Sequence, residues 1–105
     1  MYPKLVQIVP NMDTSTGELS NVLFSGSRRS ILALLYGHPD EQFYLREIAR
    51  RAGTGIGATQ RELRQLTDAG LMQNVRRGHQ VYYQANRKNP IFVELKSILA
   101  KTSGT

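Results

Sequence analysis

The sequence predicts a mainly α-helical domain with one small β-hairpin. Four stretches carry apolar residues at every third or fourth position, and one stretch of β-forming residues contains a central glycine with polar neighbours. The 105 residues, of which 40% are apolar, suffice for one hydrophobic core. We therefore expect a single domain.

The first helix is expected to start at the N-cap Ser27 and to end at Gly37 as its C′ residue. Pro39 prevents the helix from continuing. Before it, residues 1–22 combine a short apolar stretch with a run of turn-forming residues. We expect this segment to be an arm or a linker.

Two short helices joined by a tight turn follow. Residues 45–52 place apolar side chains on one stripe and charged side chains on the other, and residues 56–69 form a longer helix that Gly70 closes. Gly53 provides the turn, because glycine tolerates a positive φ. A short edge strand is expected just before them, within 41–45.

Residues 71–85 are predicted to form the β-hairpin, with Gly78 at its tip. Asn89 and Pro90 then provide the N-cap and first turn of a last helix, 89–102, before the tail 103–105. One face of that helix is apolar: Ile91, Phe92, Leu95, Ile98 and Leu99. We expect this face to pair with a second copy of the chain; packing on its own domain is the other interpretation.

The charge is strongly uneven along the chain. Lys and Arg number 14 against 8 Asp and Glu, a net charge of +6. Residues 43–105 hold 11 of the basic and only 4 of the acidic side chains. A basic half on a small domain points to a polyanionic partner.

Several classes of protein are not expected. The chain has no cysteine, which excludes disulfides and thiolate chemistry, and His38 and His79 lie too far apart in sequence to suggest a metal site. The glycine run GTGIG lacks the Lys-Ser/Thr pair of a phosphate-binding loop. We therefore expect no enzyme, no metal and no cofactor.

Membrane insertion and secretion are not expected either. The longest apolar run, Ile31 to Tyr36, is far too short to span a bilayer. The N-terminal apolar stretch is interrupted by Gln7 and ended by Pro10, unlike a secretory signal. We expect a cytoplasmic protein.

Two short helices joined at a glycine turn and followed by a basic hairpin form the winged helix-turn-helix arrangement, here over 23–88. The polar face of helix 56–69 would enter the major groove of duplex DNA, where Arg pairs with guanine and Gln with adenine. The candidate DNA contacts are Gly57, Ala58, Gln60, Arg61 and Arg64 on that helix, Arg76, Arg77, His79 and Gln80 on the hairpin, and Arg46 before them.

A solvated surface is the competing interpretation for each of these charged residues. Successive strand residues point to opposite faces, so only one of Arg76 and Arg77 is expected to face DNA. Arg28 and Arg29, at the start of the first helix, suit either a phosphate contact or an ordinary surface charge.

The segments LREIARRAG, GATQRELRQLTDAGLM and RRGHQVYYQAN resemble winged-helix regulators of the ArsR/MarR type. With LFSGSRRSILALL before them and NPIFVELKSILAKT after them, the chain is similar to the winged-helix domain found ahead of polymerase-beta-like nucleotidyltransferase domains. The chain departs from this pattern in having Gly55-Ile56 where such relatives have Ser-Pro or Asn-Pro, and Thr59 where they have Val.

This resemblance implies a homodimeric transcriptional regulator that binds double-stranded DNA. Helix 56–69 would read the major groove, the wing 76–80 would contact the flanking backbone or minor groove, and the terminal helices would dimerise. The alternative is an interaction module for a separately encoded protein partner, such as a nucleotidyltransferase.

Overall fold

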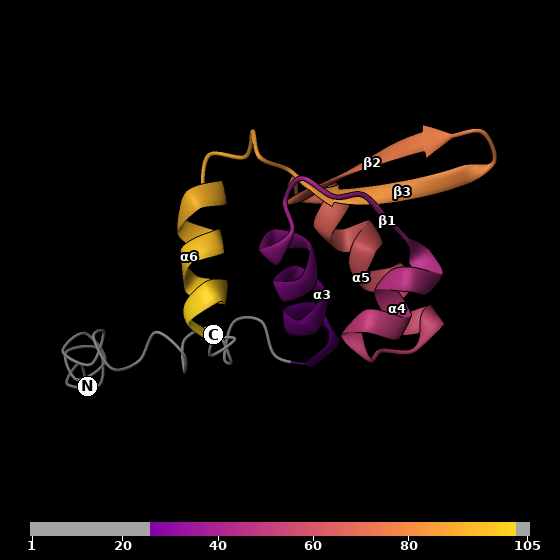
Figure 1. Ribbon diagram of the computed structural model, residues 1–105, viewed down its shortest axis with the longest axis horizontal. Helices are drawn as coiled ribbons and strands as arrows, with labels where there is room; N and C mark the ends of the chain where they lie inside the picture. Colours follow the sequence, from indigo (N-terminus) through magenta and orange to yellow (C-terminus); the bar gives the residue numbers. More distant parts are fainter. Residues whose placement is uncertain (1–25, 103–105) are drawn as a thin grey trace, which may run out of the picture.

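The computed structural model describes residues 26–102, so the expected arm 1–22 and tail 103–105 lie outside the described residues. The described chain forms four helices and a three-stranded antiparallel sheet (Figure 1). In chain order these are α3 (Gly26–Gly37), β1 (Phe43–Tyr44), α4 (Leu45–Ala52), α5 (Ile56–Asp68), β2 (Met72–Arg77), β3 (Gln80–Ala85) and α6 (Phe92–Thr102). The predicted fold class is confirmed. Within residues 26–102, no helix is both long and apolar enough to cross a membrane.

The sheet has the strand order β1-β3-β2. The predicted edge strand is β1, which pairs Phe43 with Tyr83 at one side of the hairpin. Figure 1 shows α6 on one side of α3, and α4, α5 and the hairpin on the other. The two helices of the predicted helix-turn-helix and the wing therefore share one side of the domain.

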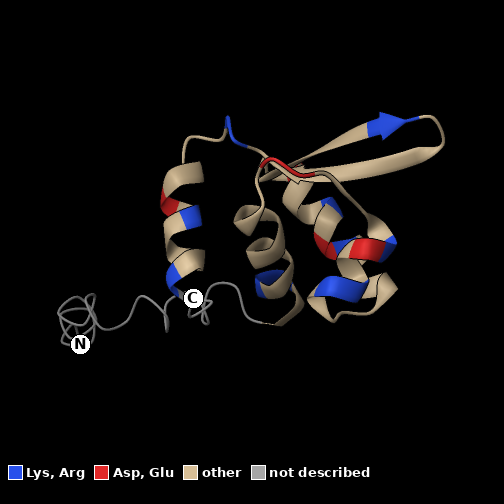
Figure 2. Ribbon diagram, viewed as in Figure 1, with Lys and Arg blue, Asp and Glu red and all other residues tan. Residues whose placement is uncertain are grey.

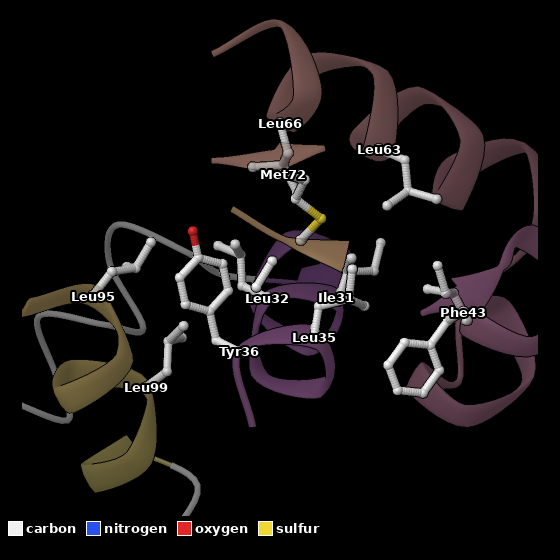
Figure 3. Close-up of a cluster of buried hydrophobic side chains, with 12 residues drawn as sticks. Ile31, Leu32, Leu35, Tyr36, Phe43, Leu63, Leu66, Met72, Leu95 and Leu99 are labelled. Carbon is white, nitrogen blue, oxygen red and sulfur yellow. The ribbon is translucent and has the colours of Figure 1, made fainter. Parts of the chain in front are cut away.

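Helix α3 is central because four of its side chains are buried. Ile31, Leu32, Leu35 and Tyr36 repeat with helical spacing and point into a core to which every other element contributes (Figure 3). The twelve buried residues of this core are Ile31, Leu32, Leu35, Tyr36, Phe43, Ile48, Leu63, Leu66, Met72, Ala85, Leu95 and Leu99.

The predicted ends of two helices need correction. Helix α3 already begins at Gly26, so Ser27 lies inside it rather than at the N-cap, and Gly37 is its last residue with no positive φ. Helix α6 begins at Phe92 rather than Pro90. The Asn89 side chain accepts a hydrogen bond from the Ile91 amide (2.9 Å), so it caps the turn that leads into α6.

The apolar face of α6 is used partly inside this chain. Leu95 and Leu99 are buried and point toward Tyr36, whose ring lies 5.3 Å from that of Phe92 between centroids (Figure 3). Packing on the chain's own domain therefore accounts for Leu95 and Leu99. Ile91, by contrast, is 51% exposed.

Tyr36 also makes a polar contact at the edge of the core. It is only 1% exposed, and its hydroxyl donates a hydrogen bond of 2.6 Å to the Leu71 carbonyl. Desolvation by burial raises the pKa of this hydroxyl to about 12, so it remains a proton donor at neutral pH. This bond joins α3 to the residue that connects α5 with β2.

Tyr36→Phe tests the contribution of this bond. The Leu71 carbonyl keeps the Asn86 amide as a donor (3.1 Å), so only one hydrogen bond is removed. We expect the free energy of unfolding to fall by about 1 kcal/mol and Tm by roughly 4–8 °C. Urea and thermal unfolding measure both. Tyr44→Phe, on a side chain that is 38% exposed, should leave stability unchanged, and equal behaviour of the two variants would contradict this role.

Candidate nucleic-acid interface

The turn between α4 and α5 depends on one left-handed glycine. Gly53 adopts φ +70°, and its amide and that of Thr54 both donate to the Ala49 carbonyl. Ala49 is itself buried. The predicted bounds of α4 and the role of Gly53 are confirmed.

Buried Thr59 anchors the start of α5 to this turn. Its amide and its hydroxyl both donate to the Gly55 carbonyl, at 2.9 and 2.7 Å. The Thr54 hydroxyl lies 2.5 Å from that of Thr59. The buried Thr59 hydroxyl therefore has hydrogen-bond partners, and Gly55, the N-cap of α5, makes no side-chain cap bond.

The two faces of α5 have separate roles. Thr59, Leu63 and Leu66 are buried. On the opposite side, Arg61 and Arg64 are exposed, and within residues 26–102 neither has a carboxylate within ion-pair distance. Gly57 and Gln60 are also exposed, whereas Ala58 is half-buried. The predicted DNA-contacting residues of this helix therefore occupy its outer face, with Ala58 at the margin.

Arg28 has a structural partner that the sequence did not reveal. Its guanidinium Nε lies 2.6 Å from the Glu62 carboxylate, and its Nη2 donates to the Gln65 side-chain oxygen. This ion pair joins α3 to α5, so Arg28 is neither a free phosphate contact nor an ordinary surface charge.

The arginines of α4 also differ from one another. Arg51 lies 3.6 Å from Glu47 and places its guanidinium 5.2 Å from the centre of the Phe43 ring. Arg46 and Arg50 are exposed. Figure 2 marks Lys and Arg positions in blue on α4, α5 and the end of β2, on the side of α3 away from α6.

The wing ends in a two-residue turn, Gly78-His79, between the paired residues Arg77 and Gln80. Gly78 has φ +61°, the conformation that favours glycine at the first position of such a turn. All four predicted wing residues (Arg76, Arg77, His79 and Gln80) are exposed.

The strand register separates Arg76 from Arg77. Arg76 pairs with Val81, on the same face of the sheet as the buried pair Met72 and Ala85, which is the face toward the helices. Arg77 points to the other face, where its guanidinium lies 5.6 Å from the centre of the Tyr82 ring. The predicted alternation is confirmed.

Two hollows lie beside the wing. One, of about 190 Å³, is lined by Gln60, Arg64, Thr67, Asp68, Asn74 and Tyr83. The other, of about 290 Å³, is lined by Tyr44, Leu45, Arg46, Gln80, Val81 and Tyr83. The fold thus brings Gln60 and Arg64 of α5 beside the wing, and Arg46 of α4 beside Gln80.

Four residues that line the first hollow are not among the predicted contacts: Thr67, Asp68, Asn74 and Tyr83. Asn74 and Tyr83 reach the first hollow from paired positions of β2 and β3, and Asp68 reaches it from the end of α5. The hairpin register was the one signal that could have placed Asn74 on this face. In the described part of the chain, no three His, Asp or Glu side chains gather closely enough to hold a metal ion.

Comparison with known proteins gives matches of structure only. No family model matches the chain, and no curated protein sequence is similar to it. A predicted DNA-binding transcriptional regulator from E. coli matches with 22% identity over 90% of this chain and 96% of that one, with a TM-score of 0.61.

Two further regulators match over 98% of this chain. Mb0332 from Mycobacterium bovis, described as a homodimeric winged helix-turn-helix DNA-binding domain and a possible ArsR-family regulator, is 18% identical over 84% of its chain, with a TM-score of 0.56. MepR, a transcription regulator of the Staphylococcus aureus multidrug efflux pump MepA, is 16% identical over 79% of its chain, with a TM-score of 0.64.

The fold also occurs within a larger enzyme. Human N-acetylserotonin methyltransferase matches with 16% identity and a TM-score of 0.53, but the chain covers 79% of its own length and only 24% of the enzyme. The chain has the winged helix-turn-helix fold, and its resemblance to regulators of the ArsR/MarR type is confirmed at the level of fold.

Replacing either of two glycines around the turn by alanine should change the free energy of unfolding, in opposite directions. Gly53→Ala places a side chain at φ +70°, and we expect it to lower the free energy of unfolding by about 1 kcal/mol. Gly57→Ala, within α5 and with open space around it, should raise that free energy by about 0.5 kcal/mol. Urea unfolding of both variants measures the two changes in free energy. Changes of the same sign would contradict the conclusion that the turn depends on the left-handed conformation of Gly53.

Proposed function

We propose that the protein is a sequence-specific regulator that binds double-stranded DNA as a homodimer. Helix α5 would lie in the major groove, and the wing around 76–80 would contact the flanking backbone or the minor groove. The observation that supports this most is the shared hollow, in which Gln60 and Arg64 of α5 face the inner side of the wing. Such a regulator would work in the cytoplasm.

The exposed cations fit a duplex partner. Arg61 and Arg64 are exposed on α5 with no ion pair in the described residues, and Arg76 points from the wing toward the helices. Guanidinium groups pair with guanine edges and with phosphates. Arg77 lies against Tyr82 on the far face, so Arg76 is the stronger candidate for the wing contact.

Dimerisation would align two copies of α5 on one face of the DNA. Two recognition helices about 34 Å apart reach successive major grooves of an inverted repeat. Leu95 and Leu99 pack inside the chain. Ile91 and Val93, near the start of α6, are exposed apolar residues that would contact the second copy. Mb0332, which has the same fold, is described as homodimeric.

Selection of bound fragments from random duplex DNA, followed by binding measurements on the selected site, tests the proposal. With about four phosphates neutralised by each protomer, the slope of log K against log salt should be near −7. Absence of binding to duplex DNA at micromolar protein and low salt would overturn it.

Arginine variants should separate base reading from backbone contact. Arg61→Ala should weaken binding to the selected site more than binding to random duplex, with a loss of about 1–3 kcal/mol on the selected site. Arg76→Ala should weaken both about equally, and Arg77→Ala should have the smaller effect of the two wing variants. Titrations on both duplexes measure this, and equal losses for Arg61→Ala on both would contradict base reading.

The proposed dimer can be tested without DNA. Sedimentation equilibrium should give about twice the mass of 11.8 kDa at micromolar concentration. Val93→Glu, on a side chain that is 71% exposed, should give a folded monomer, whereas Leu95→Ala should mainly lower stability, by about 2–5 kcal/mol, because Leu95 is in the core. A monomeric wild-type protein would contradict the dimer.

A further inference from the structure

Ile56, the first residue of α5, is an exposed apolar side chain beside a polar helix face. It is 42% exposed, whereas the apolar residues Leu63 and Leu66 of the same helix are in the core. Its neighbours Gly55 and Gly57 have no side chains, and nothing lies within 4 Å of where their Cβ atoms would stand. The start of α5 therefore presents one branched apolar side chain on an open stretch of backbone.

The helical repeat places Ile56 in line with the residues of the first hollow. Side chains four residues apart stack on one face of a helix, so Ile56, Gln60, Arg64 and Asp68 form a row. Gln60, Arg64 and Asp68 line the hollow between α5 and the wing. Ile56 extends the same row toward the N-terminal end of the helix.

The charges along this row indicate which end of α5 meets DNA most closely. Asp68 is an exposed carboxylate at the C-terminal end, and phosphates repel it. The N-terminal and middle part carries Gln60, Arg61 and Arg64 with no acidic side chain on its outer face. Recognition helices contact base edges mainly through their N-terminal residues. The first turn is thus the part expected to go deepest into the groove.

We propose that Ile56 is a specificity residue that packs against the 5-methyl group of a thymine in the major groove. Thymine is the one standard base with a methyl group on that edge, and apolar side chains recognise it by contact. The proposal rests on the proposed function and adds to it that each half-site contains a thymine at the position faced by the first turn of α5.

Replacing thymine by deoxyuridine tests this contact, because the exchange removes only the methyl group. In the selected site, each thymine is exchanged in turn, in both half-sites together, and the affinity of the wild-type dimer is measured. We expect one position at which the exchange weakens binding by about fourfold for each methyl group removed. With Ile56→Ala, the exchange at that position should have no effect, whereas Ile56→Val should keep part of it.

The outcomes separate this proposal from the proposed function. Failure of the wild-type protein to bind any duplex overturns DNA binding itself. Binding with no thymine in the selected half-site, or with the same deoxyuridine penalty in wild type and Ile56→Ala, overturns the thymine contact and leaves DNA binding standing. Circular dichroism of Ile56→Ala checks that the fold is retained, which is expected for a side chain outside the core.

Discussion

Burial of one face of α3 is the constraint on which the other elements depend. Ile31, Leu32, Leu35 and Tyr36 remove that face from water, and helices from both sides of the domain pack against it (Figure 3). Once α4 and α5 are held on one side and α6 on the other, the outer face of α5 has no partner within the described chain. The outer face of α5 is thus left open to another molecule because the core is filled from its other face.

Directed polar bonds then fix the orientation of α5 relative to its neighbours, which burial of apolar side chains alone does not determine. The Arg28–Glu62 pair ties the start of α3 to α5, and Thr59 holds the first turn of α5 to the preceding loop. At the other end of α5, the Gly70 carbonyl accepts hydrogen bonds from the side-chain amides of Asn86 and Asn89, at 2.8 and 2.9 Å. The helix that would read DNA is thereby fixed at both ends, as a recognition element held on a rigid frame requires.

Local patterns predicted most of the helices, the turn and the wing tip, because apolar periodicity and turn glycines act over a few residues. The apolar stripe of 45–52, the glycine at 53 and the glycine at 78 place α4, the turn and the wing tip where the structure has them. The Arg28–Glu62 pair spans 34 residues and has no local signature, and Asn74 enters the hollow only through the strand register. Leu95, expected on a face that pairs with a second copy, is instead buried within the chain, because an apolar stripe shows that a face is buried but not what covers it.

The separation of the two faces of α5 also bears on how such a protein changes over evolutionary time. Gln60, Arg61 and Arg64 contribute nothing to the core, so exchanging them would alter what the proposed recognition helix binds at little cost in folding free energy. Thr59, Leu63 and Leu66, one position or a few away on the same helix, have no such freedom. Under the proposed function, new target preferences would therefore be accessible by single substitutions on a scaffold that continues to fold, and a lineage of such chains would diverge in target while keeping one architecture.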